Sequence, residues 1–116
     1  MELHDFFPSV GGDCAAVLRR LPSEAMVRRF LHKFPADPSY DALHTALAAG
    51  DLAAAFRAVH TIKGTAANLG LDTLASAASA LTEALRGTDT LPPQALVDAV
   101  DAAYELTVRQ IAALDE

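Results

Sequence analysis

The chain has 116 residues, of which 52% are hydrophobic, so it suits one domain with a single core and is not an intrinsically disordered chain. Its net charge of -6 at pH 7 argues against general nucleic-acid binding, which needs a basic surface. Five of the nine Lys and Arg residues do lie between positions 19 and 33, and we interpret them as a solvated helix face.

The sequence indicates neither secretion nor membrane insertion. The N-terminus lacks the basic segment and apolar run of a signal peptide, and no apolar run approaches the ~20 residues that a membrane helix needs. Cys14 is the only cysteine, which excludes an intrachain disulfide and suits a reducing compartment. We therefore expect a cytoplasmic protein that does not contact a membrane.

Prolines, glycines and N-capping residues divide the chain into six predicted helices that follow an irregular arm. The arm covers residues 1–12, and its Phe6–Phe7 pair is expected to pack on the rest of the protein. The predicted N-caps are Asp13, Ser23, Ser39, Asp51 and Asp72. The helices are expected near residues 13–21, 23–34, 39–49, 51–69, 72–86 and 92–111.

Apolar residues recur at helical spacing through most of the chain, and no segment alternates with a period of two. In the second predicted helix we expect Val27, Phe30, Leu31 and Phe34 to be buried. Because the connections are short, consecutive helices should pack antiparallel. The sequence thus predicts a single all-α domain over residues 1–116. Its centre is expected to be an antiparallel up-and-down four-helix bundle, with an additional short N-terminal helix or helices.

A histidine in the fourth predicted helix is the residue most informative about function. At about 100° per residue, Ala58 and Ile62 fall on the side opposite His60. That apolar side should face the core, so His60 should face solvent. Lys63 and Gly64 follow His60 by three and four residues and flank it on the exposed side.

This exposed face has the residue types that phosphoryl transfer to histidine requires. A solvated imidazole is mostly neutral at pH 7, so an open ring nitrogen can accept a phosphoryl group. Lys63 can offset the added charge by a charge-assisted hydrogen bond. Glycine within a helix costs about 1 kcal/mol relative to alanine, so Gly64 indicates close approach by a partner's backbone.

The run His60-x-x-Lys63-Gly64, followed by Ala66-Ala67-Asn68-Leu69-Gly70, resembles the phosphoacceptor signature of histidine-containing phosphotransfer (HPt) domains of two-component phosphorelays. Residues 46–51 and 74–86 also fit this family, so the resemblance covers most of the chain. It implies that His60 is the phosphoacceptor, through Nε2, and that Lys63 stabilises the phosphoryl charge. It also implies a phosphoryl carrier without kinase or phosphatase activity of its own.

The resemblance further implies the partners. An HPt domain accepts a phosphoryl group from a receiver-domain aspartate, as in a hybrid sensor histidine kinase, and passes it to a response regulator. The receiver supplies Mg²⁺, so this chain is expected to bind no cofactor of its own. We expect it to be a monomer. The expected docking residues for the receiver are Phe56, Arg57, Gly64, Ala67 and Asn68.

One position departs from the family pattern. Many HPt domains have Gln or Glu twenty-two residues after the histidine, where it orients the imidazole through the other ring nitrogen. Here that position is Thr82, which Glu83 follows, and these two residues are the candidates for orienting His60. Because threonine is short, the orientation of the imidazole stays open at this point.

Three alternatives accompany this interpretation. The motif also fits a chemotaxis-kinase-type HPt domain, although no dimerisation or ATP-binding segment accompanies it here. A bundle that binds receivers without transferring phosphate is disfavoured by His60 together with Lys63 and Gly64. A metal site in the bundle core would use Glu-x-x-His or His-x-x-x-His pairs, and the sequence contains neither.

Overall fold

The structure, a computed structural model, describes residues 1–114 and contains seven α-helices, one 3-10 helix and no strand within that range. The fold is therefore all-α, as predicted. In chain order the helices are α1 (Leu3–Ser9), α2 (Cys14–Arg20), α3 (Glu24–Lys33), the 3-10 helix η1 (Phe34–Ala36), α4 (Ser39–Ala49), α5 (Leu52–Asn68), α6 (Asp72–Leu85) and α7 (Gln94–Ala113).

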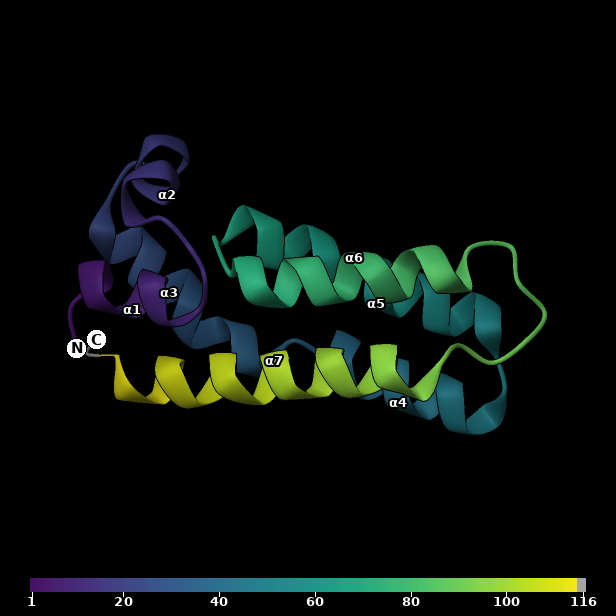
Figure 1. Cartoon of the computed structure of the whole chain (residues 1–116). Coiled ribbons are helices and arrows are strands. Elements are labelled where there is room, and N and C mark those ends of the chain that lie inside the picture. Colours follow the sequence, from purple (N-terminus) through teal and green to yellow (C-terminus); the bar gives the residue numbers. More distant parts are fainter. Residues whose placement is uncertain (115–116) are drawn as a thin grey trace.

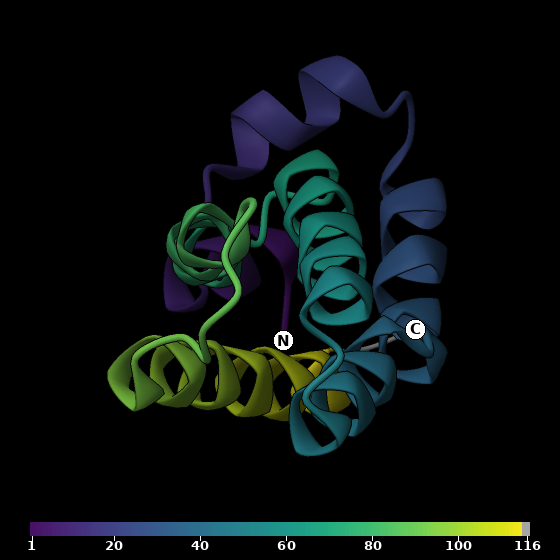
Figure 2. The same cartoon turned by 90° about the vertical axis from the view of Figure 1, so that its right-hand side faces the viewer.

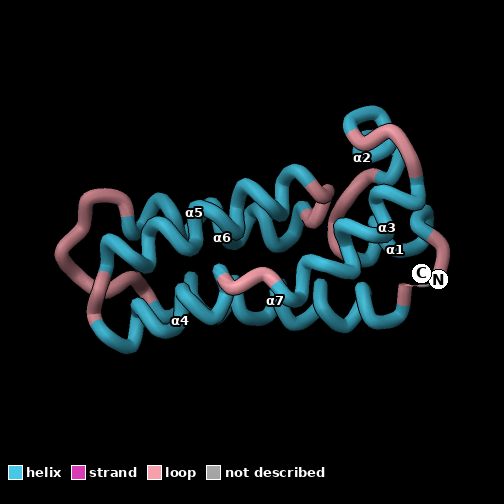
Figure 3. Tube along the Cα trace, turned by 180° about the vertical axis from the view of Figure 1, so that it is seen from behind, coloured by secondary structure: helices cyan, strands magenta, loops and turns pink. Residues whose placement is uncertain are grey.

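The long helices run side by side along a molecule that measures 42 × 21 × 21 Å. α5 packs against α4 and α6, and α6 packs against α7. Figures 1 and 3 show α3 and α4 following one another along α7, while Figure 2 looks along the bundle axis. α3 and α4 together therefore form one of the antiparallel members of the bundle. α1 and α2 lie at one end of the bundle (Figure 1).

Short polar side chains set several of the helix starts. Asp13, Ser23 and Asp51 each accept a hydrogen bond from a backbone N–H in the first turn of the next helix, at 3.0, 3.1 and 3.0 Å. These three bonds satisfy N–H groups that have no partner within the helix. Ser39 and Asp72 were also predicted as N-caps, but they are the first residues of α4 and α6.

The buried face of α5 is the one that helical periodicity predicted. Its residues pack against α4 and α6 and belong to the common core of the bundle, which leaves the opposite face of α5 open to solvent. The buried residues of α5 are Ala55, Ala58, Val59, Ile62 and Ala66. Those of α6 are Leu74, Ala78, Leu81, Thr82 and Leu85.

Residues 1–12 are not an irregular arm, which corrects the sequence prediction. Residues 3–9 form α1, and Phe6 and Phe7 are fully buried with their rings edge to face, 5.1 Å apart. Pro8 inside the segment argued against a helix, although the apolar residues recur at every third or fourth position. So short a helix is marginal alone, so its packing against the bundle stabilises it.

Phe30 is a second correction, because it is 36% exposed rather than buried. Val27 and Leu31 are fully buried, so they define the centre of the buried stripe of α3. Phe30 lies about 60° and 100° away from them around the helix. α3 lies at the edge of the bundle and buries only a narrow stripe, which leaves a residue at the border of that stripe accessible.

Aromatic and polar contacts join α4 to α7. The rings of Tyr40 and Tyr104 stack with centroids 3.7 Å apart and planes 4° apart. The Tyr40 hydroxyl donates to Asp101 Oδ1 at 2.7 Å, and His44 Nε2 lies 2.6 Å from the same oxygen. Burial and the hydrogen bond to Asp101 raise the pKa of Tyr40 above its ordinary value, so this phenol remains a donor at physiological pH.

Gly12 lies against the turn that joins α5 to α6. A Cβ atom at Gly12 would collide with the carbonyl oxygen of Gly70, a backbone atom that cannot move without shifting the turn. Gly12→Ala is therefore expected to lower the free energy of unfolding by about 1–3 kcal/mol, the usual range for overpacking. Urea unfolding followed by circular dichroism measures this change.

Gly64→Ala is the matched control for this prediction. No atom lies within 4 Å of the position that a Cβ would take at Gly64. Because glycine is unfavourable inside a helix, the alanine variant should gain roughly 0.5–1 kcal/mol of stability. A loss of stability in both variants would mean that Gly64 packs within the bundle after all.

Candidate functional site

α5 presents His60 on the face opposite its buried residues. His60 is exposed, whereas Val59 is fully buried and Ile62 is 3% exposed. The two buried neighbours fix the rotation of the helix about its axis. The imidazole is therefore held at the surface by the core packing of α5, where a second protein can reach it.

Phe56 stacks on the imidazole of His60 from one turn earlier in α5. The two ring centroids are 5.8 Å apart and the ring planes differ by 7°. Within residues 1–114 no side chain makes a hydrogen bond to His60, so this stacking is the contact that restricts the orientation of the imidazole ring. A nearly parallel arrangement leaves the ring nitrogens, which lie in the ring plane, directed away from Phe56.

Two charged residues at the C-terminal end of α6 border the same face, Glu83 in its last turn and Arg86 directly after it. Arg86 Nη2 lies 3.0 Å from Glu83 Oε1, and Arg86 Nε donates to Glu83 Oε2 at 3.2 Å. The Arg86 guanidinium also lies over the ring of Phe56, with Cζ 5.2 Å from its centroid. Arg86, with smaller contributions from Lys63 and His60, lowers the pKa of Glu83. The carboxylate is thus ionised and paired with the Arg86 guanidinium.

Neither candidate for orienting the imidazole makes a hydrogen bond to His60. Thr82 is fully buried, and its hydroxyl donates to the Ala78 carbonyl oxygen at 2.7 Å within α6. Its proton is used inside its own helix, so Thr82 is a core residue here. Glu83 lies at the surface, and its carboxylate is held by Arg86. Phe56, rather than either candidate, is the residue whose ring lies parallel to the imidazole.

Lys63 and Gly64 lie on either side of His60. Lys63 is partly exposed and contributes to the lowered pKa of Glu83 on the neighbouring helix. Gly64 is exposed and has open space where a side chain would be. The imidazole therefore has a cation on one side and an unobstructed approach on the other.

The residues predicted to dock a receiver share this face of α5. Arg57, Ala67 and Asn68 are exposed, and Phe56 is partly exposed.

A residue of another helix stabilises the last turn of α5. Arg20 Nη2 of α2 donates to the carbonyl oxygens of Ala67 and Asn68, each at 3.2 Å. A cation at a helix C-terminus also interacts favourably with the helix dipole.

Sequence reasoning missed two arginines near this face, Arg86 and Arg20. A signal for Arg86 was present, since it follows Glu83 by three residues at the end of the predicted helix 72–86, where such pairs lie side by side. Its position over Phe56 depends on how α5 and α6 pack. For Arg20 no signal existed, because the contact joins residues that are 47 and 48 positions apart.

Two further properties of the described residues bear on the alternatives. Within residues 1–114 no three His, Cys, Asp or Glu side chains gather closely enough to hold a metal ion. In the same part of the chain, none of the helices has the length and apolar character needed to cross a membrane.

An up-and-down bundle that presents histidine, lysine and glycine on one open helix face has the architecture of a phosphotransfer module. A family model described as Hpt domain matches residues 25–113, and the chain belongs to this family. Proteins of the family act in two-component phosphorelays as phosphocarriers rather than enzymes, and they interact with receiver and kinase proteins. Comparisons with curated proteins and with solved structures gave no significant match.

Proposed function

We propose that His60 is the phosphoacceptor of this chain and that it relays a phosphoryl group between receiver domains. The observation that carries the proposal is the exposed imidazole beside Gly64, inside the His60-x-x-Lys63-Gly64 run. Membership of the Hpt-domain family supports it. In this proposal the donor is a receiver aspartate of a hybrid sensor histidine kinase, and the recipient is a response regulator.

The proposed transfer needs little from the carrier itself. The lone pair of the Nε2 atom of His60 forms the N–P bond as the P–O bond to the receiver aspartate breaks, and the receiver keeps the free carboxylate. Mg²⁺ bound by the receiver offsets the charge of the transferring group, so this chain contributes position, access and cations. Lys63, which follows His60 by three residues, and Arg86, whose guanidinium lies over the Phe56 ring that stacks on His60, are the cations assigned to this role.

The test is transfer of labelled phosphate from a panel of phosphorylated receiver domains in the presence of Mg²⁺. At least one receiver is expected to lose its label to the wild-type chain, and the label should be lost in acid but survive base, as a phosphoramidate bond does. If no receiver transfers label but some bind, the chain is a binding module and the proposal fails.

Lys63→Ala is expected to slow this transfer without abolishing it. The lysine offers charge and a hydrogen bond but does not form the N–P bond. Because exposed ion pairs contribute up to about 1 kcal/mol, the rate should fall by less than about tenfold. Lys63→Arg keeps the charge and serves as the control, and single-turnover labelling measures both. Complete loss in Lys63→Ala with retention in Lys63→Arg would assign the lysine a larger role.

A further inference from the structure

An exposed ion pair lies beside the two stacked rings on the face of α5 that carries His60. Arg86 donates to both carboxylate oxygens of Glu83, from Nε at 3.2 Å and from Nη2 at 3.0 Å. Its guanidinium also lies over the ring of Phe56, which in turn stacks on the imidazole of His60. The ion pair is therefore connected to the reactive ring through Phe56.

Arg86 keeps hydrogen-bond donors that Glu83 does not use. A guanidinium has five N–H donors, and Glu83 receives those on the edge formed by Nε and Nη2. Nη1 makes no hydrogen bond to any residue between 1 and 114. Arg86 is also the first residue after α6, where the backbone is extended rather than helical. The guanidinium can therefore turn towards another anion without disturbing the core.

Exposure to solvent makes this ion pair easy to open. The side chains of Arg86 and Glu83 are 55% and 59% exposed. Exposed ion pairs contribute little to stability, because water screens the charges and two long side chains must be ordered. Arg86 nevertheless lowers the pKa of Glu83, so the carboxylate is charged at neutral pH. A second anion close by can thus compete with Glu83 for the guanidinium.

A phosphoryl group on His60 is an anion of that kind. It adds roughly two negative charges and three acceptor oxygens. A guanidinium binds phosphate in the same two-point manner as it binds a carboxylate. The ionised Glu83 repels the phosphoryl group, whereas Arg86 attracts it. Transfer to His60 therefore brings a second anion to a guanidinium that already has one.

Two further cations lie close to His60 on α5 itself. Arg57 precedes the histidine by three residues and Lys63 follows it by three, so both border its exposed side. In the part of the chain that the structure describes, neither forms an ion pair. They lose no partner when a phosphoryl group arrives, so an exchange of partners is specific to Arg86.

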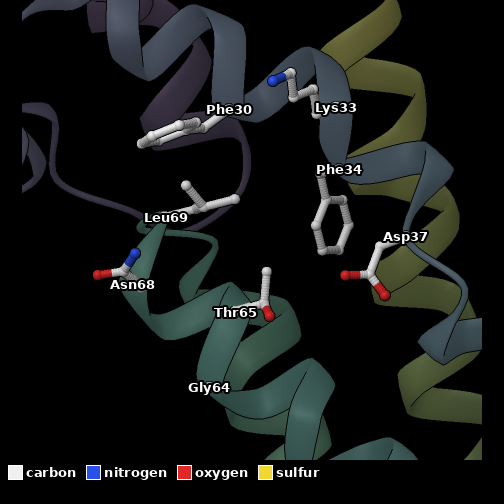
Figure 4. A pocket seen from close by; sticks show the side chains of 8 residues that line it. All are labelled: Phe30, Lys33, Phe34, Asp37, Gly64, Thr65, Asn68 and Leu69. Atoms are coloured by element: carbon white, nitrogen blue, oxygen red, sulfur yellow. The ribbon is translucent and has the colours of Figure 1, made fainter.

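The α3 side of the same face is hollowed and has no ion pair beside the imidazole. A groove of about 440 Å³ lies there between α3 and α5. Figure 4 shows Lys33 and Asp37 across this groove from the α5 backbone at Gly64. The charged contact next to the stacked rings is therefore the one on the α6 side, between Glu83 and Arg86.

We propose that Glu83 and a phosphoryl group on His60 compete for Arg86. When His60 is phosphorylated, Arg86 exchanges its hydrogen bonds to Glu83 for hydrogen bonds to the phosphoryl oxygens, and it returns to Glu83 when the group leaves. Arg86 thus favours the loaded state and Glu83 the unloaded one, while neither forms a bond to phosphorus. This inference rests on the proposed function, because it concerns the phosphoryl group that His60 carries.

The test loads His60 without a partner protein and follows the phosphoryl group by phosphorus NMR. Phosphoramidate is the donor: Nε2 bonds to phosphorus as the P–N bond breaks, and ammonia leaves with the proton that the imidazole gives up. A cation in contact lowers the pKa of an anion, and a neighbouring carboxylate raises it. The pKa of the phosphoryl group should therefore be higher in Arg86→Gln than in wild type, and lower in Glu83→Gln.

The Arg86 side chain gives a direct view of the exchange. Its Nε–H donates to Glu83 in the unloaded chain. In proton–nitrogen NMR spectra this signal, identified by its absence from Arg86→Gln, should shift when phosphoramidate loads His60. An Nε–H signal that stays unchanged on loading would show that Arg86 remains with Glu83, and the exchange would be wrong.

Two variants on α7 are the matched controls. Glu105→Gln and Arg109→Gln make the same changes of charge at exposed positions of that helix. The pKa of the phosphoryl group should remain at its wild-type value in both. Circular dichroism checks that all four variants are folded, as expected for exposed side chains.

The outcomes separate this inference from the proposed function. If Arg86→Gln behaves like Arg109→Gln, or if Glu83→Gln fails to lower the pKa of the phosphoryl group, the competition is wrong, although His60 can still relay phosphate between receivers. If both shifts occur but no receiver transfers label, the proposed function fails while the competition stands. Failure of phosphoramidate to load His60 would overturn both.

Discussion

His60→Gln is expected to abolish labelling both by receivers and by phosphoramidate, a small donor that phosphorylates imidazole without docking. An amide nitrogen is no nucleophile for phosphorus, so the variant keeps a similar shape without the reactive atom. Because His60 is exposed and lacks a hydrogen bond within residues 1–114, the change should leave stability almost unaffected. Labelling under single-turnover conditions, together with a thermal unfolding curve, measures both effects.

His4, His32 and His44 provide the internal control for this experiment. Label that persists in His60→Gln would have to lie on one of these three, and single replacements by glutamine would locate it. His44 already contacts Asp101 in the α4–α7 contact, so its loss should affect stability rather than labelling. Persistent acid-labile label in His60→Gln would overturn the assignment of the phosphoacceptor.

Gly64→Gln is expected to have the second-largest effect on transfer. The side chain would project into the open space beside His60 without disturbing the bundle, because no atom lies within 4 Å of its Cβ position. The receiver would then be held away from the imidazole. A displacement of the order of 1 Å can lower a rate on the order of 10²-fold, so transfer from the receiver should fall steeply.

Gly64→Ala and phosphoramidate are the two controls for this variant. Alanine adds one methyl group and should keep most of the transfer, while phosphoramidate should label Gly64→Gln nearly as well as wild type because it needs little space. If Gly64→Gln unfolds, the glycine is a packing residue and the outward placement is wrong. If it transfers normally, the receiver approaches from another direction.

The bundle could be predicted from the sequence because its signals are local. Asp13, Ser23 and Asp51 start their helices where short polar side chains indicated. The stripe on α5 that contains Ala58 and Ile62 followed from helical periodicity alone. α1 was missed because Pro8 argued against a helix and because its stability comes from burial of its phenylalanines in the bundle.

The geometry around His60 was only partly accessible to sequence reasoning. Which face of α5 is exposed depends on one helix, so the placement of His60 and Gly64 could be predicted. Contacts between helices depend on their crossing angle and axial offset, which one helix does not specify. For that reason Thr82 could be proposed beside the imidazole and Arg86 overlooked. Phe30 was predicted to be buried for the same reason, since periodicity cannot tell how wide the buried stripe of α3 is.

The stacked tyrosines determine what optical spectroscopy can report about this protein. The chain has two tyrosines and no tryptophan, and both tyrosines lie where α4 meets α7. Intrinsic fluorescence and near-ultraviolet dichroism of tyrosine therefore follow that one contact, whereas far-ultraviolet dichroism follows every helix. Coinciding transitions in the two signals would show that the bundle unfolds as a single cooperative unit.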